Sequence, residues 1–110
     1  MKIKQCTELF IVFDNGNTIT FHHEQDCCEH NYADFKQLDD LAKETEFDED
    51  LKFEVVDQAG FRFGNEGKMF FVPCYSWQNG YYGSDIDILY NGKLALNLFC
   101  KMVGDCEDDD

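Results

Sequence analysis

Proline, tryptophan and basic residues are scarce in this chain of 110 residues, which has one proline, one tryptophan and nine lysines and arginines. So few cations disfavour direct binding to nucleic acid, because that affinity comes largely from Lys and Arg displacing counterions from phosphates. No run of apolar residues approaches the roughly 18 that a membrane-spanning helix needs. We therefore expect direct contact with neither nucleic acid nor a membrane.

The signatures of common enzyme classes are also missing. The chain has no phosphate-binding Gly-x-x-x-x-Gly-Lys-Ser/Thr, no Gly-x-Gly-x-x-Gly, no Gly-x-Ser-x-Gly and no His-Glu-x-x-His. Its first residues, MKIKQCTELFIVF, lack the long apolar core of a secretion signal. This favours a cytoplasmic protein whose six cysteines are reduced thiols, and a non-enzymatic function over an enzymatic one.

Acidic residues are abundant and clustered. They number 23 and give a net charge of −14. Residues 39–50, called the acidic segment here, hold seven acids and one lysine, and residues 104–110, called the acidic tail, hold five acids. A nearly neutral domain that carries two acidic clusters suits a basic partner.

Alternating apolar residues predict strands at 3–13, 18–23, 51–55, 61–63, 69–75 and 85–90. Pro73 places the fifth of these at a sheet edge or a bulge, since proline cannot donate a ladder hydrogen bond. From residue 31 the apolar spacing changes to three and four residues, which predicts one amphipathic helix. Its apolar stripe consists of Tyr32, Phe35, Leu38, Leu41 and Ala42.

These elements predict an α+β domain over residues 1–103, followed by the acidic tail from residue 104. Its antiparallel sheet would have about five to seven strands, with one main helix packed on one face. Asp39, Asp40 and Glu44 would then surround the C-terminal end of that helix and oppose its dipole.

The segment after residue 90 leaves two choices open. A two-residue turn at 91–92 would pair Leu96 with Asp87, whereas a three-residue loop would pair it with Ile88. The apolar pairing favours the longer loop. Residues 94–102 also fit a helix that stops at Gly104, so strand and helix both remain open for residues 93–103.

The richest chemistry lies in HHEQDCCEH at residues 22–30. Its candidate site residues are His23, Asp26, Cys27, Cys28 and His30. They supply zinc ligand types, but adjacent cysteines cannot easily chelate one ion, and the acids around them disfavour a reactive thiolate. The favoured interpretation is a purely structural role without a cofactor, in which Asp26 caps a helix and one cysteine packs into the core. The alternatives are a zinc site and a thiol nucleophile.

A second candidate is the loop SWQNGYYG at residues 76–83, with Trp77, Asn79, Tyr81 and Tyr82. Aromatic residues on a loop supply a large contact area at low entropy cost, which is typical of a binding loop. The alternative is that Asn79 and Gly80 form a turn whose rings cover the corner at 22–30.

Both segments contribute to a resemblance. Over about residues 7–90 the chain resembles a small family of uncharacterised domains found mainly in bacteriophages and prophages, with an H-x-Q-D-C-C-E motif and a later N-G-Y-Y motif. The matching positions are His23, Gln25, Asp26, Cys27, Cys28, Glu29, Asn79, Gly80, Tyr81 and Tyr82. Gly83 stands where the family has serine, and residues 91–110 look appended. The resemblance implies phage ancestry and a bacterial host cytosol, but no activity.

Charge and resemblance together predict a protein-binding modulator or inhibitor of a basic host protein that normally binds nucleic acid. Acidic side chains would stand in for phosphates. The residues assigned to this surface are Asp39, Asp40, Glu44, Asp48, Glu49, Asp50, Asp108, Asp109 and Asp110. The alternative function is a metal-binding or thiol-dependent enzyme centred on residues 22–30.

Overall fold

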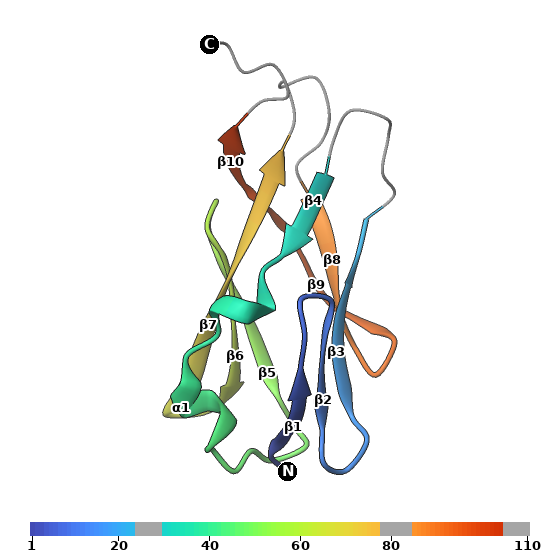
Figure 1. The fold of residues 1–110 in the computed structure, drawn as a ribbon, viewed down its shortest axis with the longest axis vertical. Helices are drawn as coiled ribbons and strands as arrows, with labels where there is room; N and C mark the ends of the chain where they lie inside the picture. The colour runs from blue at the N-terminus through green and yellow to red at the C-terminus, as the bar shows by residue number, and fades with distance from the viewer. Residues whose placement is uncertain (24–29, 78–84, 105–110) are drawn as a thin grey trace.

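Two β-sheets packed face to face form the molecule (Figure 1). The computed structural model describes residues 1–23, 30–77 and 85–104. In the first sheet the strand order is β1-β2-β3-β8-β9, and in the second it is β10-β7-β6-β5, with β4 also paired to β7. The strands are β1 (Ile3–Cys6), β2 (Phe10–Phe13), β3 (Thr18–His22), β4 (His30–Ala33), β5 (Lys52–Val56), β6 (Gly60–Asn65), β7 (Lys68–Trp77), β8 (Asp85–Tyr90), β9 (Lys93–Phe99) and β10 (Lys101–Gly104).

The core lies between the sheets because alternate residues of each strand point to opposite faces. In β8, for example, Ile86 and Ile88 are buried while the aspartates beside them are only partly covered. The ring of Phe47 bridges the two layers, with centroids 5.9 Å from Phe13 and 5.8 Å from Phe63. One continuous cluster of buried residues therefore joins both sheets.

The prediction of an α+β fold with one main helix is wrong. The longest helix of the described residues is α1 (Asp40–Lys43), which has four residues, and a 3-10 turn, η1 (Phe35–Gln37), precedes it. The start of the predicted helix is the strand β4, paired with β7. Leu41, assigned to the apolar stripe, is 62% exposed. The protein is a β-sandwich.

Local capping and tertiary pairing explain why the helical spacing misled. The side chains of Asp34 and Asp39 each accept a backbone N–H two residues later and begin a separate short turn. Leu38 between them has ψ 137°, an extended conformation that no helix can pass through. Phe35, Leu38 and Ala42 are still buried, so their spacing marked core residues but not a helix.

The pairing of β8 with β9 was predicted correctly, although by another mechanism. Leu96 faces Ile88 and Leu98 faces Ile86, as the apolar match required. The connection, however, is a two-residue turn at 91–92 with positive φ at both residues, and a bulge between Ile88 and Leu89 restores the register. Residues 93–99 and 101–104 are strands, so the helical alternative is wrong.

Pro73 lies where β7 changes partners. Residues 68–73 of β7 pair with β6, residues 74–77 pair with β4, and residues 75–77 pair with β10. The proline therefore ends one ladder within the sheet and does not lie on an outer edge. β10 extends to Gly104, and an independent acidic tail from residue 104 stays a prediction.

Candidate functional site

The described residues that flank the two motif segments gather at one end of the sandwich (Figure 1). His30, at the start of β4, is paired with Trp77, at the end of β7. Gly104, at the end of β10, is paired with Trp77 as well. Asp85 begins β8 at the same end, next to the end of β3. His30 and Trp77, which are 47 positions apart along the chain, are therefore neighbours in the fold.

A buried polar cluster fixes this end of the sandwich. The Ser76 hydroxyl donates to the Asn31 side-chain carbonyl at 2.5 Å, and both residues are at most 1% exposed. The Asn31 amide donates to the Asp85 carbonyl at 3.3 Å and lies 3.3 Å from Nε2 of His23. Because buried polar groups must be satisfied, this cluster ties β4, β7 and β8 to the end of β3.

Most residues predicted for this region lie outside the described part of the chain. They are Asp26, Cys27, Cys28, Asn79, Tyr81 and Tyr82, together with the side chains of His30 and Trp77. His23 is described, half-buried and next to the Asn31 amide. Residues 1–23, 30–77 and 85–104 contain no group of three or more His, Cys, Asp or Glu that could hold a metal ion.

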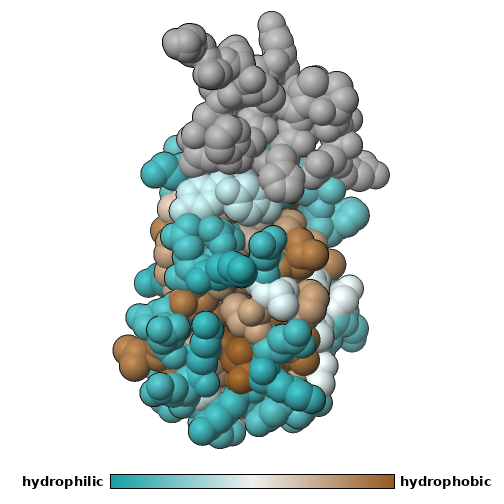
Figure 2. Space-filling model, in the orientation of Figure 1, coloured by the Kyte–Doolittle hydropathy of each residue, from teal (hydrophilic) through white to brown (hydrophobic). Residues whose placement is uncertain are grey.

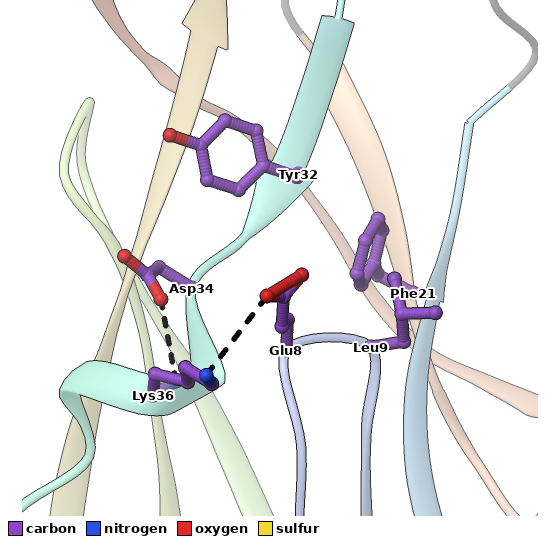
Figure 3. Close-up of a pocket in the computed structure, with 6 residues that line it drawn as sticks. All are labelled: Glu8, Leu9, Phe21, Tyr32, Asp34 and Lys36. Atoms are coloured by element: carbon purple, nitrogen blue, oxygen red, sulfur yellow. Dashed lines mark hydrogen bonds and ion pairs between the residues drawn. The ribbon is translucent and has the colours of Figure 1, made fainter.

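A pocket of about 380 Å³ opens between the β1–β2 turn and β4 (Figure 3). Its lining consists of Glu8, Leu9, Phe21, Tyr32, Asp34 and Lys36. Sequence reasoning assigned no binding role to any of these residues. They come from the β1–β2 turn, β3, β4 and the start of η1, and only the packing of the two sheets brings them together.

The acidic segment lies at the opposite end of the sandwich from Gly104, where hydrophilic side chains cover the surface (Figures 1 and 2). All six of its residues assigned to the binding surface are exposed. Two of them do not oppose a helix dipole as predicted, because Asp39 caps the N-terminus of α1 and Asp40 lies in its first turn. The helix dipole favours acids at the N-terminus, so Asp39 and Asp40 stabilise α1, and the prediction that they destabilise a helix is wrong.

Inward-facing contacts hold the backbone that follows α1. Phe47 is 1% exposed in the core, and its carbonyl accepts from the Met1 amino group at 2.6 Å. The Asn65 side-chain oxygen Oδ1 accepts from the Asp48 backbone N–H at 2.7 Å. The Tyr90 hydroxyl donates to the Glu49 carbonyl at 2.7 Å. Residues 47–50 have neither helix nor strand, yet the Met1 amino group and the side chains of Asn65 and Tyr90 fix their backbone.

The carboxylates of the acidic segment point outward, and four of its seven acids are unpaired among the described residues. Asp40 lies 3.5 Å from Lys43, and Glu46 lies 2.8 Å from the Met1 amino group. Glu44, Asp48, Glu49 and Asp50 have no side-chain hydrogen bond or ion pair among the described residues. Asp108, Asp109 and Asp110 lie outside the described part, and the strand that leads to them ends at the far end of the sandwich.

Three of the cysteines are described, and all three are free thiols. Cys74 and Cys100 are buried, and a hydrogen bond between them together with burial raises the pKa of the Cys74 thiol. Cys6 is half-buried, and burial raises its pKa as well. A raised pKa keeps a thiol protonated, which is the opposite of what a nucleophile needs.

The fold and surface define a small acidic β-sandwich protein with one acidic end and a side pocket. The chain belongs to a family described as a domain of unknown function (DUF7448), whose model matches residues 1–88. The family match thus ends within β8 and leaves β9 and β10 outside it. No curated protein and no solved structure matches the chain.

None of the helices of the described residues is long and apolar enough to cross a membrane.

Proposed function

We propose that this protein is a binding protein of phage or prophage origin that acts in the cytosol of a bacterial host. It modulates or inhibits a basic host protein that normally binds nucleic acid, and its acidic segment replaces phosphate groups. The H-x-Q-D-C-C-E and N-G-Y-Y resemblance supports the phage origin. The outward carboxylates on a fixed backbone support the phosphate replacement.

The observation that carries this proposal is the fixed backbone of residues 47–50. Its contacts to Met1, Asn65 and Tyr90 use main-chain groups and leave the carboxylates exposed. A surface held in one conformation loses less entropy on binding than a flexible acidic run. Its charges also speed association with a basic partner by electrostatic steering.

The test compares two variants with the same change in net charge. Asp48→Asn with Glu49→Gln alters the acidic segment, and Glu54→Gln with Asp57→Asn alters exposed acids on and just after β5. Immobilised protein captures partners from bacterial lysate, and association rates are then measured with each purified partner over a range of salt concentrations. The first variant should slow association and flatten its salt dependence more than the second.

Added DNA should displace the partner if the acidic segment occupies a nucleic-acid site. Deleting residues 105–110 tests the acidic tail separately. A partner whose binding ignores salt, DNA and the acidic-segment variant would contradict the proposal and direct attention to Trp77, Tyr81 and Tyr82 instead.

The second candidate function is metal or thiol chemistry at residues 22–30. It draws support from the zinc-ligand residue types that HHEQDCCEH supplies at residues 22–30. We propose that the protein works without a cofactor, so elemental analysis of purified protein should find no stoichiometric zinc. One zinc per chain would favour the metal-binding candidate.

A further inference from the structure

The pocket in Figure 3 lies between the β1–β2 turn, which belongs to the first sheet, and β4, which pairs with the second sheet. Its volume of about 380 Å³ falls at the lower end of the roughly 300–1,000 Å³ that small-ligand sites occupy. Such a volume suits one long side chain or a ligand of similar size. Hydrophobic side chains interrupt the hydrophilic surface in the middle of this face (Figure 2).

Two aromatic rings form fixed apolar walls. Phe21 packs against the buried ring of Phe35, with centroids 6.1 Å apart. Tyr32 packs against Tyr75, with centroids 5.7 Å apart. Phe21 and Tyr32 are both half-buried, so each ring contributes to the core and to the pocket. Leu9, which is 62% exposed, adds an aliphatic surface at the rim.

The polar part of the lining carries two carboxylates and one ammonium group. Asp34 is held in place, because its Oδ1 accepts from the Lys36 backbone N–H at 3.3 Å and its Oδ2 accepts from the Gln37 side chain at 2.8 Å. Glu8 and Lys36 are 3.9 Å apart, with side chains 72% and 65% exposed. An exposed pair at that distance contributes little, so either group can turn to a ligand.

We propose that this pocket binds an arginine side chain of a protein partner. The guanidinium group is planar and weakly hydrated, stacks on aromatic faces and forms paired hydrogen bonds with carboxylates. Phe21 and Tyr32 supply the faces, Asp34 and Glu8 supply the carboxylates, and Leu9 covers the aliphatic stem. The proposal rests on the proposed function in one respect, since a basic partner is the source of the arginine.

Other ligand classes fit the lining less well. An anion would meet two carboxylates and a single ammonium group. A lysine side chain carries a compact, strongly hydrated charge that stacks poorly and cannot bond two carboxylates in one plane. A purely apolar ligand would leave the carboxylates beside it without solvent.

The experiment uses the whole protein and the blocked tripeptide acetyl-Gly-Arg-Gly-amide, with citrulline in place of arginine as an uncharged isostere. Backbone NMR shifts during titration report both the position and the affinity of binding. The arginine peptide should shift residues 8–9, 21 and 32–36, and the citrulline peptide should bind at least about tenfold more weakly.

Variants of the lining residues should change the affinity for the arginine peptide in opposite directions. Glu8→Gln and Asp34→Asn should each weaken arginine binding about tenfold, and asparagine at 34 still caps η1. Lys36→Gln should tighten binding a few-fold, because it removes the competing ammonium group. Weaker binding in Lys36→Gln, or equal binding of the two peptides, would overturn the proposal.

The two proposals fail separately. The Asp48→Asn, Glu49→Gln variant should bind the tripeptide about as well as the unaltered protein, because the acidic segment is not part of the pocket. Loss of tripeptide binding at the pocket with intact salt-dependent partner binding would exclude the arginine site alone. Tripeptide binding without any salt-dependent partner would exclude the phosphate-replacement function alone.

Discussion

The hydroxyl of Ser76 and the side-chain carbonyl of Asn31 share a buried hydrogen bond that joins the residues next to both motif segments. Ser76 is the first residue of the predicted aromatic loop at 76–83, and Asn31 directly follows the segment 22–30. Their strands are adjacent, with the two residues directly opposite each other. The described residues that flank segments 24–29 and 78–84 are therefore held next to each other by this hydrogen bond.

Breaking this contact should destabilise the fold. Asn31→Ala and Ser76→Ala should each lower the free energy of unfolding by about 1–3 kcal/mol, because a hydrogen bond between buried groups is lost. The double variant should lose less than the two single losses added together, as expected of residues in contact. Urea denaturation of all four proteins measures this coupling, and strictly additive losses would contradict it.

Among the acidic residues of residues 39–50, Asp39 should contribute to the stability of the fold because it caps α1, whereas an unpaired acid such as Glu49 should not. Asp39→Ala removes the hydrogen bond to the Leu41 N–H and should cost about 0.5–2 kcal/mol. Glu49→Gln, its exposed and unpaired counterpart, should change stability by no more than about 0.5 kcal/mol. Thermal unfolding of the two variants tests the difference. Equal effects would mean that α1 needs no cap.

Stability should fall at alkaline pH because of Tyr90. Burial raises the pKa of its phenol, the hydrogen bond from Asn17 opposes that shift, and Glu49 and Asp50 add to it. The folded state therefore keeps this proton at a pH where the unfolded chain releases it. The resulting stability is complete below the ordinary tyrosine pKa of about 10 and is lost as pH rises through the folded value.

Tyr90→Phe is the matched variant, since it keeps the ring that packs against Phe53 at 5.7 Å. It should cost about 0.5–1.5 kcal/mol at neutral pH through the lost bond to the Glu49 carbonyl. Between about pH 9 and pH 11 it should lose less stability than the unaltered protein. Urea titrations across that range show the difference, and parallel losses would exclude Tyr90 as the cause.

Reactivity of the cysteines should follow burial. In the native protein iodoacetamide should modify Cys6, which is half-buried, faster than Cys74 and Cys100, which are at most 2% exposed. In denaturant the three rates should converge. Peptide mass spectrometry after timed alkylation measures each site, and rapid labelling of Cys74 in the native protein would contradict its buried position.

Strand positions follow from the sequence wherever neighbouring residues alone decide the conformation. The alternation in residues 85–90 predicts β8 with its observed bounds, whereas the sequence left strand and helix both open for the segment that forms β9. The apolar match of Leu96 with Ile88 determines the register, since a one-residue slip would turn the buried face of β9 to water. The exposure of the acidic segment likewise follows from its composition.

Residues 31–43 show where local pattern fails. Their apolar spacing fits a helix, but Asn31 finds a partner in Ser76, 45 positions along the chain, and β4 joins the second sheet. The pocket has the same origin, because Glu8, Phe21 and Lys36 have no shared pattern in the sequence and meet only when the sheets pack. The sequence by itself determined where the charges lie and where strands such as β8 form, but it missed β4 and the turn between β1 and β2. The tertiary structure alone decided how they combine, because hydrogen bonds and packing between distant segments outweigh the weak preferences of short ones.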